Sequence, residues 1–182
     1  MSDNIIGLKS GYVKLLSHRS EWEQIAADTI SLLRSIIGDI CIDIQHVGST
    51  AIKGIYAKPI IDIAVAVNEL TNILPYIEEL EQNGISYRKE EHTGQLLFII
   101  KDSSEDIKTH HIHVVRADST NWENYLNFRD YLNAFHDKAE EYNALKLSLA
   151  AEFRNDRKAY TASKAELIGR LLCEARRWRN RK

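Results

Sequence analysis

A single carboxylate interrupts an otherwise apolar segment of the chain. The run IIDIAVAV, at 60–67, predicts a central strand covered on both faces, and Asp62 lies within it. A carboxylate in such a strand is costly unless it is paired, hydrogen-bonded or bound to a metal. Because side chains alternate along a strand, Asp62 shares a face with Ala64 and Ala66, whose small size leaves room for a ligand. We therefore expect a functional role for Asp62; the alternative is a structural carboxylate that is capped or paired with Lys58.

Three histidines within four positions form a second group of candidate ligands. They lie in the predicted strand THHIHVV, where His111 and His113 share one face and His110 points to the other. A His-x-His pair on one face is a good partial ligand set for Zn²⁺, Mn²⁺ or Fe²⁺. If the two strands are neighbours, Asp62 would complete a two-histidine, one-carboxylate set, with His46 as an additional candidate. The alternatives are ordinary hydrogen bonds, or a phosphate contact without metal that weakens above pH ~6.5 as the imidazolium form is lost.

A glycine–serine turn separates the strand predicted at 41–47 from the Asp62 strand. Glycine lets the backbone approach a phosphate closely, and consecutive backbone N–H groups can form an anion nest. The serine hydroxyl adds a donor. Gly48, Ser49 and Thr50 are therefore candidate phosphate-binding residues, although such turns are also common in purely structural loops.

Cationic side chains provide further candidates for a phosphate contact. Lys58 directly precedes Pro59 and the buried strand, whereas Lys53 is expected to be solvated. Arg129 stands beside Asp130 on a predicted helix, so it either forms an internal ion pair or reaches the cleft.

The elements that must position these residues follow from hydrophobic periodicity. Strands are predicted at 12–16, 41–47, 60–67, 85–89, 94–101 and 107–115, and helices at 22–37, 71–82, 121–135, 137–153 and 161–178. The last two strands would be joined by a hairpin loop, DSSED. The order βαββαβββ, followed by helices, indicates an α+β fold with a mixed β-sheet flanked by helices and a C-terminal helical segment.

Local signals set several helix ends. Ser20 and Glu23 form a predicted capping box before the first helix. Ser119 and Thr161 are candidate N-caps of later helices. Gly84, after Asn83, fits the left-handed position at a helix end.

The composition is typical of a soluble globular protein. The chain has 182 residues, of which 27% are charged, and we expect one domain over 1–182, with a sheet core at about 12–115 and a helical part at about 119–179. The net charge of −2 does not favour a nucleic-acid binder. No apolar run is long enough to cross a membrane, the N-terminus lacks a secretory signal, and two cysteines cannot form a disulfide framework, so a cytoplasmic location is expected.

The stretch HVGSTAIKGIYAKPIIDIAVAV resembles the signature of the GrpB family, a group similar to the nucleotidyltransferase superfamily. That superfamily's pattern is a hydrophobic residue, Gly, Gly or Ser, about a dozen residues, then Asp-hydrophobic-acid on a strand. Twelve residues separate Ser49 from Asp62 in this chain. The resemblance extends to THHIHVV, NWENYLNFRDYL, EEYNALKLSLA and YTASKAELIGRLL, and so covers nearly the whole sequence.

The resemblance implies a nucleotidyltransferase-like fold and transfer of a nucleoside monophosphate from a nucleoside triphosphate to a small acceptor. It implies that Gly48 and Ser49 hold the triphosphate and that Asp62 is catalytic and carries Mg²⁺ or Mn²⁺. The histidine pair itself adds Zn²⁺ as an alternative. Tyr160 and Lys164 match the family's YTxxK block, which suggests a helix start near the site.

The chain departs from the superfamily pattern at Ala64, where a second acid is expected, and a third acid on the THHIH strand is also missing. Three hypotheses remain open. The protein is a metal-dependent nucleotidyltransferase; or it is a catalytically degenerate relative that binds a nucleotide, a phosphorylated metabolite or a protein partner in an accessory role; or it is a His/Asp metalloprotein of other chemistry, such as metal-assisted hydrolysis.

Overall fold

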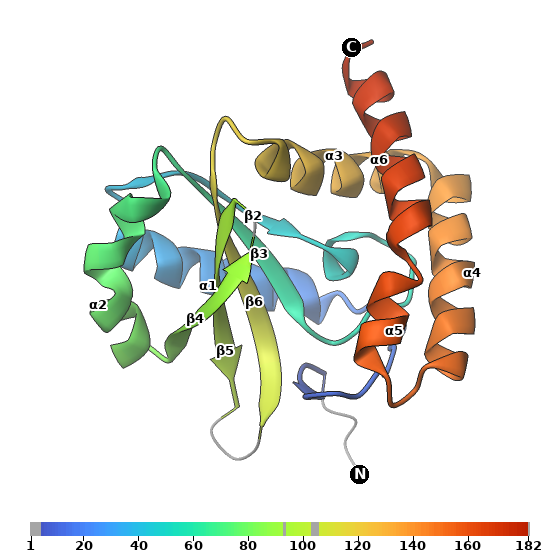
Figure 1. The fold of residues 1–182 in the computed structure, drawn as a ribbon, viewed down its shortest axis with the longest axis horizontal. Coiled ribbons are helices and arrows are strands. Elements are labelled where there is room, and N and C mark those ends of the chain that lie inside the picture. The colour runs from blue at the N-terminus through green and yellow to red at the C-terminus, as the bar shows by residue number, and fades with distance from the viewer. Residues whose placement is uncertain (1–4, 93, 103–105, 182) are drawn as a thin grey trace.

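A mixed β-sheet runs through the centre of the computed structural model, which describes residues 5–92, 94–102 and 106–181 (Figure 1). The strands are β1 (Leu8–Lys9), β2 (Cys41–Val47), β3 (Ile61–Val67), β4 (Ile85–His92), β5 (Gln95–Lys101) and β6 (Ile107–Arg116). The α-helices are α1 (Glu21–Ile37), α2 (Ile77–Gln82), α3 (Thr120–Ala134), α4 (His136–Glu152), α5 (Arg157–Ala162) and α6 (Ala165–Arg179), with 3₁₀-helices η1 (Ser49–Ala51) and η2 (Leu70–Tyr76).

The sheet order is β2-β3-β6-β5-β4, and β1 pairs with β6. β3 and β6 are parallel, and the other pairs are antiparallel. Since a parallel pair needs a long crossover connection, the chain between these two strands carries η2, α2 and the β4–β5 hairpin. This confirms the α+β fold with a mixed sheet.

One face of the sheet packs on the N-terminal helix. The odd-numbered residues of β3, among them Ile61 and Ile63, join Trp22 and Leu33 of α1 in the main hydrophobic core. The Trp22 indole donates a hydrogen bond of 2.8 Å to the Ile5 carbonyl. Burial of these large apolar side chains is the main force that fixes the sheet against α1.

The loop between β2 and β3 is held by the C-terminal helices, which Figure 1 shows grouped at one side of the sheet. Ile52 and Ile55 of this loop are buried against side chains of α3, α4 and α6. The loop backbone also donates hydrogen bonds to these helices: Lys53 N donates to Asn133 Oδ1 at 3.0 Å, and Tyr56 N to Asn143 Oδ1 at 2.8 Å. A loop that begins at the glycine–serine turn is therefore rigidly placed.

Several predicted elements agree with the structure. The strand at 41–47 matches β2, and the first helix ends at Ile37, before Gly38, as its pattern indicates. Ser119 caps α3, with its side chain accepting from Trp122 N at 3.3 Å. Gly84 has a φ of +79° at the end of α2. In the described part of the chain, no helix combines the length and the apolar character needed to cross a membrane.

The first predicted strand is wrong. Within 12–16, Val13 N donates to Arg154 O at 3.0 Å, whereas Leu16 forms an isolated bridge with Ala57. The backbone partners of this segment thus belong to two different regions, so no ladder forms. The sheet is instead joined by the shorter Leu8–Lys9.

Helix boundaries also differ from the predictions. Ser20 has helical dihedral angles and its hydroxyl bonds to Glu21, so the capping box does not form. Thr161 lies inside α5, whose N-cap is Asp156, and the helix predicted at 161–178 is α6 preceded by this short helix. The helix predicted at 71–82 begins as the 3₁₀-helix η2, which contains Pro75. The predicted DSSED hairpin loop falls largely at 103–105, outside the described residues.

Candidate metal and phosphate site

The parallel pairing of β3 and β6 brings the candidate ligands together. Asp62 lies opposite His111 in the register, and His113 lies opposite Ala64, so all three side chains share one face. Asp62 Oδ1 is 3.2 Å from His111 Nδ1 and 3.7 Å from His113 Nε2. One ligand atom from each of the three residues lies within 4.8 Å of the others. Two imidazoles and one carboxylate are a donor set suited to Mn²⁺, Fe²⁺ or Zn²⁺.

Asp62 remains ionised at neutral pH although it is largely enclosed. Its side chain is 28% exposed. Burial alone raises the pKa of this carboxyl, but hydrogen bonds and charge from His111 and His113 outweigh that effect and hold the pKa below its ordinary value. The site therefore presents a carboxylate rather than a carboxylic acid.

The three residues face a cavity of about 520 Å³, a size in the range of small-molecule sites. The cavity lies between the sheet and the C-terminal helices. It is lined by Gly48, Ser49, Lys58, Ile60, Asp62, His111, His113, Tyr125, Lys146, Arg157, Tyr160, Thr161, Lys164 and Ile168.

Positive charge dominates the cavity wall. Lys58, Lys146, Arg157 and Lys164 face it, and Asp62 is the only acid among its lining residues that the structure describes. Burial and the neighbouring cations lower the pKa of Lys58 and of Lys146 to about 7. Burial also lowers the pKa of Lys164, to about 8. Burial thus disfavours the charged form of these lysines, and a bound anion would favour it.

Tyr160 of α5 organises two of these lysines. The Nζ atom of Lys58 lies 4.5 Å from the centre of its ring, and that of Lys164 lies 4.4 Å away. Such distances allow cation–π attraction, which places both ammonium groups at the cavity wall. The YTxxK block therefore lines the cavity: Tyr160 lies in α5, and Lys164 is the N-cap of α6, so a helix starts at the end of the block.

Three of the predicted site residues do not line the cavity: His46, Thr50 and Arg129. His46 is opposite Ile63 in the register, on the face turned away from Asp62, and its Nε2 is 2.9 Å from the hydroxyl of buried Thr50. Arg129 donates to Gln45 Oε1 at 2.8 Å and to the His46 carbonyl at 3.0 Å. It also pairs with its neighbour Asp130. His46 thus connects β2 to the turn at Thr50, and Arg129 connects β2 to α3.

Three polar lining residues were missed from the sequence. Lys146 is only 1% exposed, and its Nζ donates to the Tyr56 carbonyl. A usable signal existed, since Lys146 follows Tyr142 by four residues on the buried side of a helix. Tyr125 has helical spacing with Phe128 and Leu132, which predicts a core position, but its ring lies 5.1 Å from that of His113. Arg157 gave no signal, because it lies in a polar segment without periodicity.

A sequence profile described as "GrpB protein" matches residues 12–174. The chain belongs to the GrpB family. The Glutamate-rich protein GrpB of Alkalihalophilus pseudofirmus is 38% identical over 173 residues, a match that covers 93% of this chain and 99% of that protein. The crystal structure of the conserved protein GrpB from Enterococcus faecalis superimposes with a TM-score of 0.81 at 28% identity, over 89% of this chain and 96% of the other.

A more distant structural neighbour of this GrpB protein is the Cid1 poly(U) polymerase with bound MgGTP. The TM-score is 0.48 at 16% identity, over 74% of this chain and 43% of the polymerase.

Proposed function

We propose that this GrpB protein binds a nucleoside triphosphate together with one divalent cation and transfers the nucleoside monophosphate to a small acceptor. The observation that carries the proposal is the placement of Asp62, His111 and His113 at the wall of a cavity that also holds four cationic side chains. A site that combines a candidate cation-binding set with cations that have no ion-pair partner among the described residues matches a ligand with several negative charges and an affinity for metal.

Different residues would bind the ion and the phosphate groups of such a ligand. Asp62, His111 and His113 would hold the ion, and the two imidazoles favour Mn²⁺ over Mg²⁺, which prefers oxygen ligands alone. A bound ion supplies charge neutralisation at the transferring phosphorus. Lys58 and Lys164 would contact phosphate oxygens directly, since both ammonium groups reach the cavity wall.

The rest of the cavity suits the organic part of a nucleotide. Gly48 and Ser49 line it beside the ligand set and offer close backbone approach and a hydroxyl donor. Tyr125 and Ile168 add apolar surface that a ribose or a nucleobase would cover. We expect these contacts to position the nucleotide and the cations to offset its charge.

A second candidate is binding of a nucleotide or phosphorylated metabolite without transfer. Ala64 stands on the same face as Asp62, at the position where a two-metal site has a further carboxylate. The described cavity wall contains a single acid, so the shared carboxylates of the usual two-metal mechanism are missing there. This observation favours a one-ion site. Whether the bound nucleotide is transferred is therefore the question that separates the two candidates.

Calorimetry on the full chain tests the binding step. ATP, GTP, CTP and UTP are titrated with Mn²⁺ or Mg²⁺, using the wild type and Asp62→Asn. We expect at least one nucleotide to bind in the presence of Mn²⁺ and to lose about tenfold or more in affinity in the variant. The absence of binding by all four nucleotides contradicts the transferase and restricts the second candidate to a phosphorylated metabolite.

Pyrophosphate release separates the two candidates. Each binding nucleotide is incubated with Mn²⁺ and a mixture of small hydroxyl- and amine-bearing metabolites. Release that depends on the mixture and disappears in Asp62→Asn supports transfer. Tight binding of the nucleotide without release supports the binding-only candidate.

A further inference from the structure

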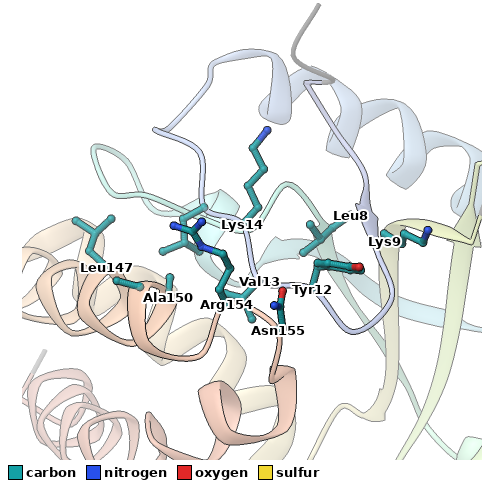
Figure 2. A pocket seen from close by; sticks show the side chains of 11 residues that line it. Leu8, Lys9, Tyr12, Val13, Lys14, Leu147, Ala150, Arg154 and Asn155 are labelled. Carbon is teal, nitrogen blue, oxygen red and sulfur yellow. The ribbon is translucent and has the colours of Figure 1, made fainter. Parts of the chain in front are cut away.

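We propose that a second cavity binds an amphiphilic organic anion, a small molecule with an acyl or aryl body and one carboxylate or sulfonate group. This cavity, of about 680 Å³, lies between the N-terminal segment 8–15 and the end of α4 with the turn after it (Figure 2). Its volume is within the range of small-molecule sites. It shares no lining residue with the cavity that holds Asp62, so it is a separate site.

The floor of the second cavity is apolar and partly open to water. Val13, Leu147 and Ala150 line it, with Tyr12 at the opposite side in Figure 2. Tyr12 is 50% exposed and Leu147 39% exposed. Exposed apolar surface of this kind is unfavourable in water, so a ligand with an apolar body gains free energy by covering it.

The charges around this floor have one sign. Lys9, Lys14 and Arg154 line the cavity, and no acid is present among its lining residues that the structure describes. Figure 2 shows Arg154 extending between Leu147 and Tyr12. An anionic group attached to an apolar body would therefore meet a guanidinium directly beside apolar surface.

Two further observations support a bound small molecule. Among the described residues, no ion-pair partner is found for the Arg154 guanidinium, so its charge is available to a ligand. The two walls are also tied together, because Val13 N donates to Arg154 O at 3.0 Å. A cavity whose walls are held in place loses little conformational entropy when a ligand binds.

The test uses 8-anilinonaphthalene-1-sulfonate, a fluorescent aryl anion, with decanoate as a competing acyl anion. Two variants address the cavity: Arg154→Glu reverses its charge, and Ala151→Trp fills it from an exposed position of α4. Two variants serve as controls. Lys89→Glu makes the same charge change on an exposed residue of β4, and Lys164→Ala removes a cation from the Asp62 cavity. Circular dichroism verifies the fold of each protein.

We expect saturable binding of one probe molecule per chain, displaced by decanoate. Arg154→Glu and Ala151→Trp should each weaken binding about tenfold or more, while both controls stay within about twofold of the wild type. The proposal is overturned if no saturable binding occurs, or if Lys164→Ala abolishes binding while the cavity variants retain it. It is also overturned if the protein sediments with phosphatidylglycerol vesicles but binds neither soluble anion, since the surface would then be a lipid contact.

Discussion

Gly48 lies directly against the carboxylate of Asp62. A Cβ atom placed on Gly48 would be 2.8 Å from Asp62 Cβ and 2.9 Å from its Cγ, and nearer still to Oδ2. The backbone at Gly48 has φ +70° and ψ −169°, a combination that side-chain-bearing residues rarely adopt. The turn after β2 and the acid on β3 are therefore fitted to each other, and each constrains the other's position.

Replacing Gly48 by alanine should harm both stability and the site. Gly54→Ala is the matched control, because Gly54 has a similar φ of +79° with no heavy atom within 4 Å of an added Cβ. We expect Gly54→Ala to cost about 1 kcal/mol, and Gly48→Ala to cost about 2 kcal/mol more and to weaken Mn²⁺ binding. Urea unfolding and calorimetry measure the two effects. An equal loss of unfolding free energy in both variants would show that Asp62 moves away from the added methyl group without destabilising the fold.

The three histidines of β6 should separate into two functional classes. His111→Ala and His113→Ala should lower Mn²⁺ affinity by about tenfold or more, since each removes a candidate ligand. His110→Ala should leave that affinity unchanged. It should instead destabilise the fold by about 1–3 kcal/mol, because His110 is buried and contacts Thr29 Oγ1 at 3.1 Å. Metal titration and chemical unfolding of all three variants distinguish the classes; loss of metal in His110→Ala would count against the proposed ligand set.

Binding of anions in the Asp62 cavity should take up protons and weaken at alkaline pH. The pKa values of Lys58 and Lys146 are lowered to about 7 and that of Lys164 to about 8, so these lysines lose charge as the pH rises from 6.5 to 9. A bound anion raises these pKa values again, and the complex therefore gains protons. Calorimetry with pyrophosphate in metal-free buffers of different ionisation enthalpy measures the uptake. Lys164→Met should reduce it, and proton release on binding would contradict the assignment.

Stability should fall in mild acid partly because of His46. Burial lowers the pKa of His46 to about 4, below the value of 6.5 expected in the unfolded chain. Between these values the unfolded state binds more protons, so His46 reduces stability as the pH falls from 6.5 to 4, by up to about 3 kcal/mol. Unfolding of the wild type and of His46→Gln at pH 7 and 4.5 isolates this contribution. We expect a smaller loss in the variant; identical losses would mean that His46 titrates normally.

The elements of the fold were largely predictable because their signals are local. The apolar run of β3 and the periodicity of α1 each depend on neighbouring residues alone, and both appear where the sequence places them. The segment 12–16 failed because its backbone partners, Arg154 and Ala57, lie elsewhere in the chain. The local sequence pattern does not indicate which distant segment a strand pairs with.

The grouping of Asp62, His111 and His113 was predictable only on the condition that two strands are neighbours. A register shifted by one residue would have placed His110, rather than His111, beside Asp62. That register is set by tertiary packing and by the hairpin between the strands, which sequence spacing does not reveal. Lys146 was overlooked for a related reason, since a buried lysine looks like a surface residue until α4 is placed against the loop at Tyr56.

The separation of Asp62 and His111 by 49 residues has a consequence for how the protein matures. On the ribosome, the acid of β3 emerges well before its histidine partners, and a nascent chain lacking β6 holds an apolar strand with an uncompensated carboxylate. At the proposed site, cation binding would therefore wait until β6 has paired with β3. In a refolding experiment, the time at which Mn²⁺ binding begins would report when β6 has joined the sheet.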